Sequence, residues 1–216
     1  MTNPVTVHGV AGSPYVRAVL LGFEEKGVPW RLAPMAPGDN RAPAHLARMP
    51  FGRLPAIEHD GFTLYESQAI LRWTDATFEG PALQPADPRD AARMDQLMGI
   101  NDWYVFKSWG SPIGFERIIK PMFLGLPTDE AAIAPALPLA RTCVEVLDEL
   151  LGAQTFLTGE RLTLADLMLA PQLEFFAMTP EGQSMLPGTR LPTWLARMQL
   201  RPSWAATATE ALRAAA

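Results

Sequence analysis

A change of pattern at residues 79–90 constrains the fold more than any other feature of the sequence. This segment, EGPALQPADPRD, carries four proline or glycine residues in quick succession, which is typical of a linker. Short β-rich runs alternate with helical spacing before it, and no convincing strand pattern follows it. We therefore expect an α/β domain at residues 1–79, a linker at 80–88 and an all-helical domain at 89–216.

The first part of the chain reads as alternating strands and helices. A β-branched run at residues 5–10 precedes a segment, 16–23, whose apolar residues have helical spacing. A second strand is expected at 28–35, a hairpin at 54–66 and a short helix at 67–78. The order β-α-β followed by β-β-α predicts a small mixed sheet with helices on its faces.

The helical part contains one strong folding signal and the only cysteine. In LTLADLMLA, Thr163 is placed to cap a helix and Asp166 to complete a capping box, with the cap contributing about 1 kcal/mol. Cys143 falls on the apolar face of another helix and is expected to be a small buried hydrophobe. These residues indicate folding rather than chemistry.

Composition excludes several classes of function. The net charge is −5 and no run of Lys and Arg occurs, which argues against a nucleic-acid-binding protein. No stretch approaches the roughly 20 apolar residues that span a bilayer, and the N-terminus lacks a secretory pattern, so we expect a cytoplasmic protein without membrane contact. A single cysteine leaves no intramolecular disulfide, CxxC pair or cysteine zinc cluster, and we expect no metal.

Three junctions in the first domain are candidates for chemistry. In AGSPYVRAV, Ser13 begins a helix and is either a helix cap or a catalytic group. A hydrolase nucleophile is a weaker alternative, because GSP is not a GxSxG elbow and His8, His45 and His59 show no matching spacing. Ser67 also starts a helix and either caps it or helps to bind an anion there. Spacing alone favours a trans bond before Pro55.

The sequence resembles the soluble glutathione transferase superfamily over essentially its whole length. The resemblance is carried by VTVHGVAGSPYVRAVLLGFEEKGVPW, MPFGRLPAIEHDGFTLYESQAILRW and LTGERLTLADLMLAP. It implies an N-terminal thioredoxin-like domain and a C-terminal all-helical domain. The serine, spacer and arginine of SPYVRAV are similar to the theta-like and phi-like branches, which use a catalytic serine.

The resemblance implies a role for each junction. Ser13 would donate its hydroxyl to the sulfur of glutathione and favour the thiolate. Leu54 and Pro55 would form a bend in which the proline is cis and the backbone of Leu54 pairs with the cysteinyl part of glutathione. Glu66 and Ser67 would hold the γ-glutamyl group, the serine at its carboxylate and the glutamate near its amino group.

The remaining contacts are also implied by the resemblance. Arg41 and Arg53 are candidates for the glycine carboxylate of glutathione, although Asn40 stands where phi-like members often have a histidine. Phe51 is a candidate contact in a homodimer. The apolar pocket for the electrophilic substrate would be built on the aromatic-rich part of the helical domain. Its candidate residues are Trp103, Phe106, Trp109 and Phe115, which helical spacing alone would assign to a core.

The resemblance therefore leads to a glutathione transferase as the expected function. Glutathione is the co-substrate, and the second substrate is a small hydrophobic electrophile or an organic hydroperoxide. A non-catalytic family member that binds glutathione or hydrophobic ligands is one alternative. A glutathione-dependent isomerase is another, although its usual double-serine and cysteine pattern is absent here.

Overall fold

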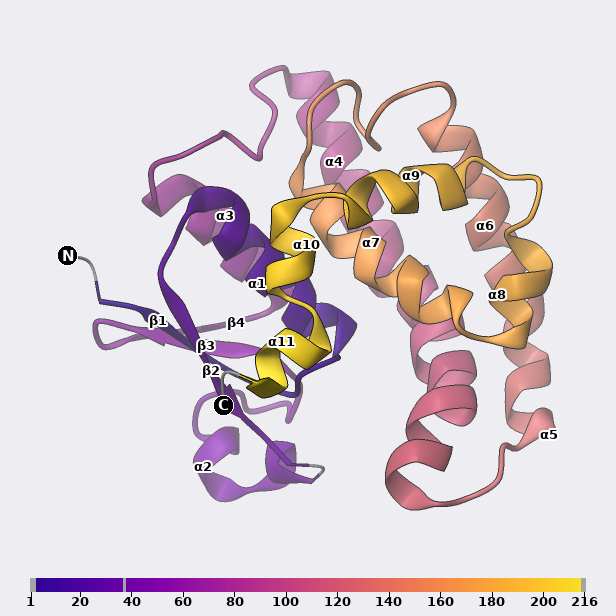
Figure 1. Ribbon diagram of the computed structural model, residues 1–216, viewed down its shortest axis with the longest axis horizontal. Coiled ribbons are helices and arrows are strands. Elements are labelled where there is room, and N and C mark those ends of the chain that lie inside the picture. Colours follow the sequence, from indigo (N-terminus) through magenta and orange to yellow (C-terminus); the bar gives the residue numbers. More distant parts are fainter. Residues whose placement is uncertain (1–2, 37, 215–216) are drawn as a thin grey trace. The chain divides into compact units, whose positions relative to one another are not determined.

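The chain forms two units in a computed structural model that describes residues 3–36 and 38–214 (Figure 1). One unit runs up to Gln84 and also includes the chain from Gln199 onward, and the other is Pro85–Met198. The first contains a sheet and helices, and the second is helical in its described part. This is the two-part fold that the sequence predicted.

A four-stranded mixed sheet forms the centre of the first unit. The strands are β1 (Val5–Gly9), β2 (Trp30–Pro34), β3 (Ala56–His59) and β4 (Phe62–Tyr65). Their order in the sheet is β2-β1-β3-β4, with β1 and β2 parallel and β3 antiparallel to both of its neighbours. All four predicted strands are therefore confirmed.

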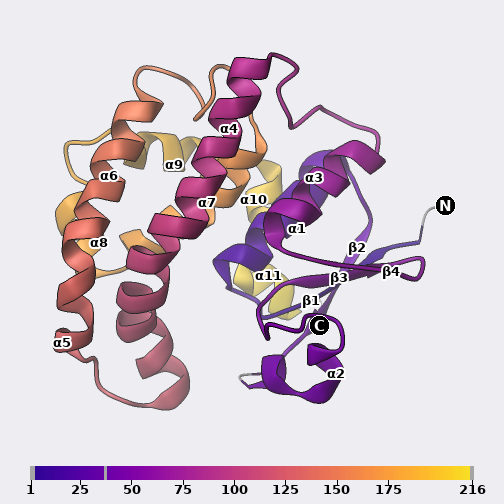
Figure 2. The same ribbon diagram turned by 180° about the vertical axis from the view of Figure 1, so that it is seen from behind.

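Helices cover both faces of this sheet. The helices of this unit are α1 (Pro14–Lys26), η1 (Asp39–Arg41), α2 (Pro43–Leu46), α3 (Ser67–Thr77), α10 (Pro202–Ala206), which packs on α1, and α11 (Thr209–Ala214). Helices α1 and α3 lie side by side on one face, and α2 lies on the other side of the sheet (Figures 1 and 2). Val5 and Val7 of β1 are completely buried beneath the helices that cover the sheet. Gly27 ends α1 in the left-handed conformation that favours glycine.

A buried ion pair joins α1, α3 and the chain that follows α3. Lys26 Nζ lies 3.0 Å from an Asp75 carboxylate oxygen, and both side chains are buried. Asp75 also accepts hydrogen bonds from the backbone N–H groups of Leu83 and Gln84. Burial alone raises the pKa of Asp75, but these hydrogen bonds and Lys26 outweigh it and hold the pKa below its usual range. The first half of the predicted linker is thereby fixed to the first unit.

The C-terminal segment differs from the predicted domain division, which placed it with the helical domain. Arg201 donates two hydrogen bonds to the carboxylate of Glu25 on α1, at 2.7 and 2.6 Å. The guanidinium of Arg17 lies 4.1 Å from the centre of the Trp204 ring and donates to the Trp204 carbonyl at 3.0 Å. Through contacts such as these, residues 199–214 pack with the first unit.

The second unit is a bundle of helices. Its helices are α4 (Pro88–Ile100), η2 (Asn101–Leu124), α5 (Glu130–Ile133), η3 (Ala134–Ala136), α6 (Leu137–Leu151), α7 (Leu164–Ala177), α8 (Pro180–Met185) and α9 (Leu191–Gln199). The long segment η2 is π-helical and contains Pro112 and Pro121. Helix α7 is buried along most of its length and packs against α4 and η2. Within the described residues, no helix is long and apolar enough to cross a membrane.

Asp166, at the start of α7, is the centre of the predicted capping box. Its carboxylate accepts hydrogen bonds from the backbone and the hydroxyl of Thr163 at 2.9 and 3.0 Å. It also accepts from the Leu157 backbone at 2.9 Å and from the Trp194 indole at 3.0 Å. Complete burial raises the pKa of this carboxyl group against the effect of its donors. The box thus joins α7 to α9 and to the preceding loop.

Replacing Asp166 by alanine is expected to lower the free energy of unfolding by about 3 kcal/mol or more, because it leaves several buried donors unpaired. Asp87→Ala is the matched control, since Asp87 caps α4 at an exposed position, and its loss costs about 1 kcal/mol. Urea denaturation followed by circular dichroism measures both. Equal effects of the two substitutions would contradict this role of Asp166.

Candidate active site

The pairing of the strands brings three connecting segments to one end of the sheet: the one after β1, the loop between β2 and β3, and the one after β4. Gly9, the last residue of β1, pairs with Pro34, the last residue of β2. His8 pairs with Ala56 at the start of β3, and Ala56 pairs in turn with Tyr65 at the end of β4. The segments that follow β1, β2 and β4 and the segment that precedes β3 therefore meet. These segments contain every residue that the sequence analysis assigned to glutathione.

Ser13 lies at the N-cap position of α1, but its side chain does not cap the helix. The residue has an extended backbone (φ −66°, ψ 125°), and its side chain makes no cap hydrogen bond. Gly9 permits the close approach of the helix, because a β-carbon there would come within 2.5 Å of the side chain of Val16. Ser13 thus presents a half-buried hydroxyl at the N-terminus of a 13-residue helix, where the potential favours an anion.

The segment before β3 contains the predicted bend. The Leu54–Pro55 peptide bond is cis, as the resemblance implied and as spacing alone did not. Pro55 is buried, whereas Leu54 is half-buried. Leu54 lies two residues before the start of β3, and β3 starts opposite the end of β1. The backbone of Leu54 is therefore at the same end of the sheet as Ser13.

Glu66 and Ser67 form the junction between β4 and α3. Glu66 has φ 70° and ψ 113°, a conformation that residues with a side chain rarely adopt. Its side chain is exposed, and Ser67, the first residue of α3, is 7% exposed. The junction places a carboxylate and a hydroxyl at the N-terminus of a second helix, close to the end of the sheet where α1 begins.

The loop between β2 and β3 positions the two candidate arginines. Gly52 has φ +62°, and the side-chain amide of Asn40 donates to its carbonyl at 2.8 Å. The Arg41 side chain crosses this glycine, since a β-carbon there would meet Arg41 Nη1 at 2.9 Å. Arg41 and Arg53 are both exposed. Asn40 thus holds two parts of the loop together through its hydrogen bond to Gly52, and Arg41 and Arg53 place positive charge on the surface of the loop.

The three histidines make hydrogen bonds that do not include Ser13. His8 Nε2 pairs with the Glu58 carboxylate at 2.5 Å, and burial lowers the pKa of His8 despite this partner. His59 Nε2 lies 3.2 Å from the carbonyl oxygen of Asn3. His45 Nε2 lies 2.8 Å from the carbonyl oxygen of Arg53. None of these contacts supplies the serine–histidine pair of a hydrolase.

Sequence reasoning missed His45. It considered the histidines only as partners of a nucleophilic serine, although His45 and Met49 are four residues apart and therefore share one helical face. Both residues are buried and contact Arg53, next to the bend. The i, i+4 spacing just before the PFG segment was the available signal.

The lone cysteine is not part of the segments that carry the candidate site. Cys143 is buried on α6 in the second unit, and burial raises the pKa of its thiol. It behaves as the small hydrophobe that the sequence predicted. Among the residues that the structure describes, no group of three or more His, Cys, Asp or Glu residues is arranged to hold a metal ion.

The four aromatic candidates for a substrate pocket fall into two groups on η2. The side chains of Trp103 and Phe115 are 64% and 39% exposed, and Phe106 is half-buried. Trp109 is only 1% exposed. The first three can therefore contact a ligand from the surface of the second unit, whereas Trp109 cannot.

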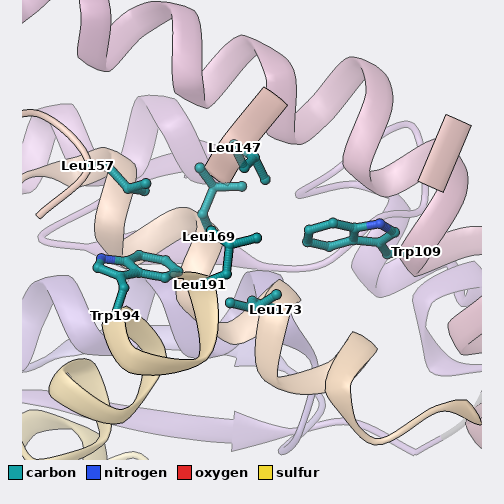
Figure 3. A pocket seen from close by; sticks show the side chains of 7 residues that line it. All are labelled: Trp109, Leu147, Leu157, Leu169, Leu173, Leu191 and Trp194. Carbon is teal, nitrogen blue, oxygen red and sulfur yellow. The ribbon is translucent and has the colours of Figure 1, made fainter. Parts of the chain in front are cut away.

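Trp109 belongs to the core of the second unit, which corrects its assignment to the pocket. Its indole N–H donates to the Ala140 carbonyl at 3.2 Å, and its ring stacks on Phe176 with centroids 4.5 Å apart. Figure 3 shows Trp109 and Trp194 on two sides of a group of leucines. These side chains surround a packing gap that is too small for a water molecule. An aromatic residue with helical spacing is here part of the core.

Family models match both parts of the chain. Residues 7–82 match the N-terminal domain of glutathione S-transferases, and residues 130–206 match their C-terminal domain. A glutathione S-transferase from Hyoscyamus muticus is 32% identical over 202 residues, which cover 92% of this chain and 94% of that relative.

Solved structures agree with this assignment. Glutathione transferase F2 from Populus trichocarpa has a TM-score of 0.86 and 26% identity, and the match covers 98% of this chain and 100% of that one. A theta-class glutathione S-transferase from Xanthomonas axonopodis pv. citri, solved with glutathione bound, has a TM-score of 0.82 and 29% identity, with 94% and 96% covered. The fold and the family matches define an enzyme of the glutathione-dependent class. The chain belongs to the glutathione S-transferase family, and it is a glutathione transferase with glutathione as its co-substrate.

Trp109→Ala is expected to lower the free energy of unfolding by about 3–5 kcal/mol, because it removes a large buried ring. Trp103→Ala, on the same helix, is expected to change it by at most about 0.5 kcal/mol, because that ring is exposed. Urea denaturation compares the two variants. A small effect at position 109 would return this residue to the list of pocket candidates.

Proposed function

We propose that Ser13 activates glutathione by donating its hydroxyl hydrogen to the sulfur and so stabilising the thiolate. The observation that carries the proposal is that the Ser13 hydroxyl stands at the N-terminus of α1 without being used as a cap. A capping hydroxyl would be directed at the backbone of its own helix. This one is available to a ligand, and the sulfur of glutathione is the group that needs a donor.

The size of the effect is sufficient for catalysis. A hydrogen bond to a charged group contributes about 1.5–3 kcal/mol, which corresponds to roughly one to two pKa units. Because an ordinary cysteine thiol has a pKa near 8.5, such a shift raises the thiolate at neutral pH from a few per cent to a substantial fraction, roughly a quarter to three quarters. The N-terminus of α1 adds a favourable potential for the anion. The thiolate is the nucleophile, so its population sets the rate of attack.

The γ-glutamyl end of glutathione is assigned to the junction of β4 and α3. The hydroxyl of Ser67 and the first N–H groups of α3 suit its carboxylate, because a helix N-terminus attracts an anion. The exposed carboxylate of Glu66 suits its ammonium group. The unusual backbone of Glu66 supports this assignment, since strained residues gather at binding sites.

The rest of the tripeptide is assigned to the loop before β3. The backbone of Leu54, preceding Pro55, would pair with the cysteinyl part. Arg41 and Arg53 would meet the glycine carboxylate, because an exposed guanidinium binds a carboxylate with paired hydrogen bonds. The γ-glutamyl part is thus assigned to the junction of β4 and α3, the cysteinyl and glycine parts to the loop before β3, and the sulfur to Ser13, all at one end of the sheet.

The second substrate is proposed to be a small hydrophobic electrophile. The glutathione thiolate attacks its electrophilic carbon, a carbon–sulfur bond forms and the leaving group departs with the bonding electrons. Trp103, Phe106 and Phe115 on η2 would contact it, because they offer aromatic surface that is not fully buried. An organic hydroperoxide is the other substrate class, reduced to an alcohol and water while two glutathione molecules form a disulfide.

A homodimer is part of the proposal. The Phe51 side chain is 65% exposed and makes an edge contact with Tyr65, with ring centroids 6.3 Å apart. It stands in the loop that also carries Gly52 and Arg53, so a partner subunit that covered it would also protect the glutathione site.

Ser13→Ala is expected to lower kcat roughly 10- to 100-fold with an aryl halide substrate, because the thiolate loses a charge-assisted hydrogen bond. Binding of glutathione should weaken much less, since its other contacts remain. Steady-state kinetics and calorimetric titration measure the two effects. Stability should change by less than the roughly 1 kcal/mol of a lost cap, because the hydroxyl makes no cap bond.

Ser13→Thr is the matched control, because it retains a hydroxyl and should keep much more activity than the alanine variant. Equal turnover of Ser13→Ala and the unchanged protein would contradict the proposed role. A protein that binds glutathione but turns over no aryl halide, epoxide or hydroperoxide would instead be a binding member of the family.

A further inference from the structure

We propose that His45 is a positioning residue for glutathione, because it fixes the peptide group that carries the N–H of Leu54. The inference rests on the proposed function, in which the backbone of Leu54 pairs with the cysteinyl part of glutathione. His45 does not touch the ligand in this account. It acts through Arg53, the residue between the PFG segment and the bend.

The backbone carbonyl and the backbone N–H of Arg53 both form hydrogen bonds with side chains. One side chain is that of His45 on α2, and the other is that of Met49, just after this helix. His45 Nε2 lies 2.8 Å from the Arg53 carbonyl oxygen. The Arg53 N–H donates to the sulfur of Met49 at 3.3 Å. Arg53 precedes β3, and its N–H and carbonyl take no part in the strand pairs of the sheet. The two side chains therefore replace the sheet hydrogen bonds that would hold a strand residue.

The carbonyl of Arg53 and the N–H of Leu54 belong to the same peptide group. A peptide group is planar, so the direction of its oxygen sets the direction of its N–H. When His45 holds the Arg53 oxygen on one side, the Leu54 N–H is held pointing to the other. A ligand that accepts a hydrogen bond from Leu54 then meets a donor that is already oriented.

The environment of His45 fits this single task. His45 is buried, with only 3% of its surface exposed. A carbonyl oxygen only accepts, so Nε2 carries the hydrogen of this bond. Within residues 3–36 and 38–214, Nδ1 is buried without a hydrogen-bond partner. The bond to Arg53 is therefore the one polar contact of the ring that is seen there, and an unpaired nitrogen is tolerated to keep it.

The test compares His45→Gln with His45→Met. The two side chains have similar length and flexibility, but only glutamine can donate a hydrogen bond to the Arg53 carbonyl. The methionine variant should raise KM for glutathione about threefold to tenfold, the range of a lost neutral hydrogen bond. The glutamine variant should stay within about twofold of the unchanged protein, and kcat at saturating glutathione should be similar in all three.

His59→Met is the matched control. His59 also places Nε2 near a backbone carbonyl, that of Asn3, but it lies at the opposite end of β3 from Pro55. Its substitution should leave KM for glutathione unchanged. Met49→Leu removes the acceptor of the Arg53 N–H and should raise KM slightly, which keeps the inference testable if the His45 variants do not fold.

Two results would overturn the inference. One is an unchanged KM in folded His45→Met, and the other is an equal rise of KM in the glutamine and methionine variants, which would indicate a loss of ring packing. Direct titration of the unchanged protein separates these failures from a failure of the proposed function. If that protein does not bind glutathione, the proposed function is wrong; if it does and the variants bind equally well, only the role of His45 is wrong.

Discussion

The register of the sheet is the constraint on which the site depends. Because Ala56 pairs with both His8 and Tyr65, the end of β1, the start of β3 and the end of β4 must lie together. The helices that follow β1 and β4 then begin at the same end of the sheet, at Ser13 and Ser67. Two helix N-termini in one place create a site for anions before any particular side chain is considered.

The polar side chains at these junctions are divided between folding and chemistry. In the second unit, the Asp166 carboxylate accepts hydrogen bonds from the Thr163 backbone at the start of α7 and from the Trp194 indole. In the first unit, Ser13 stands at the N-cap position of α1, which Thr163 occupies in α7, and its side chain makes no cap hydrogen bond. The contrast supports a functional role for Ser13, because α1 is held in place instead by burial and by the buried pair of Lys26 and Asp75. The loop before β3 is ordered by His45, Met49 and Asn40 rather than by strand pairing.

Much of the fold could be predicted from the sequence, because its strands and helices carry local signals. Alternating β-branched residues and the proline-rich change near residue 80 gave the two parts, and Thr163 with Asp166 marked the start of α7. The position of residues 199–214 could not be predicted, because it depends on long-range contacts such as Arg201 with Glu25. The cis bond at Pro55 was also out of reach of spacing and came only from the resemblance.

The candidate site was predictable in part. Helix-start signals located Ser13 and Ser67, but whether a serine caps its helix depends on a side-chain rotation that the sequence does not encode. Trp109 was misassigned because a buried ring and a pocket ring have the same helical spacing. The partner of His45, a backbone carbonyl, could not be identified from the sequence, and the i, i+4 spacing of His45 and Met49 was the only signal that pointed to this residue.

The most direct test of the central claim is the pKa of the glutathione thiol when it is bound. The ultraviolet absorbance of the thiolate can be titrated against pH in complexes with the unchanged protein and with Ser13→Ala. If Ser13 stabilises the thiolate, the bound thiol titrates roughly one to two units below its ordinary value near 8.5, and its pKa returns towards that value in the variant. An identical thiol pKa in the two complexes would contradict activation by Ser13.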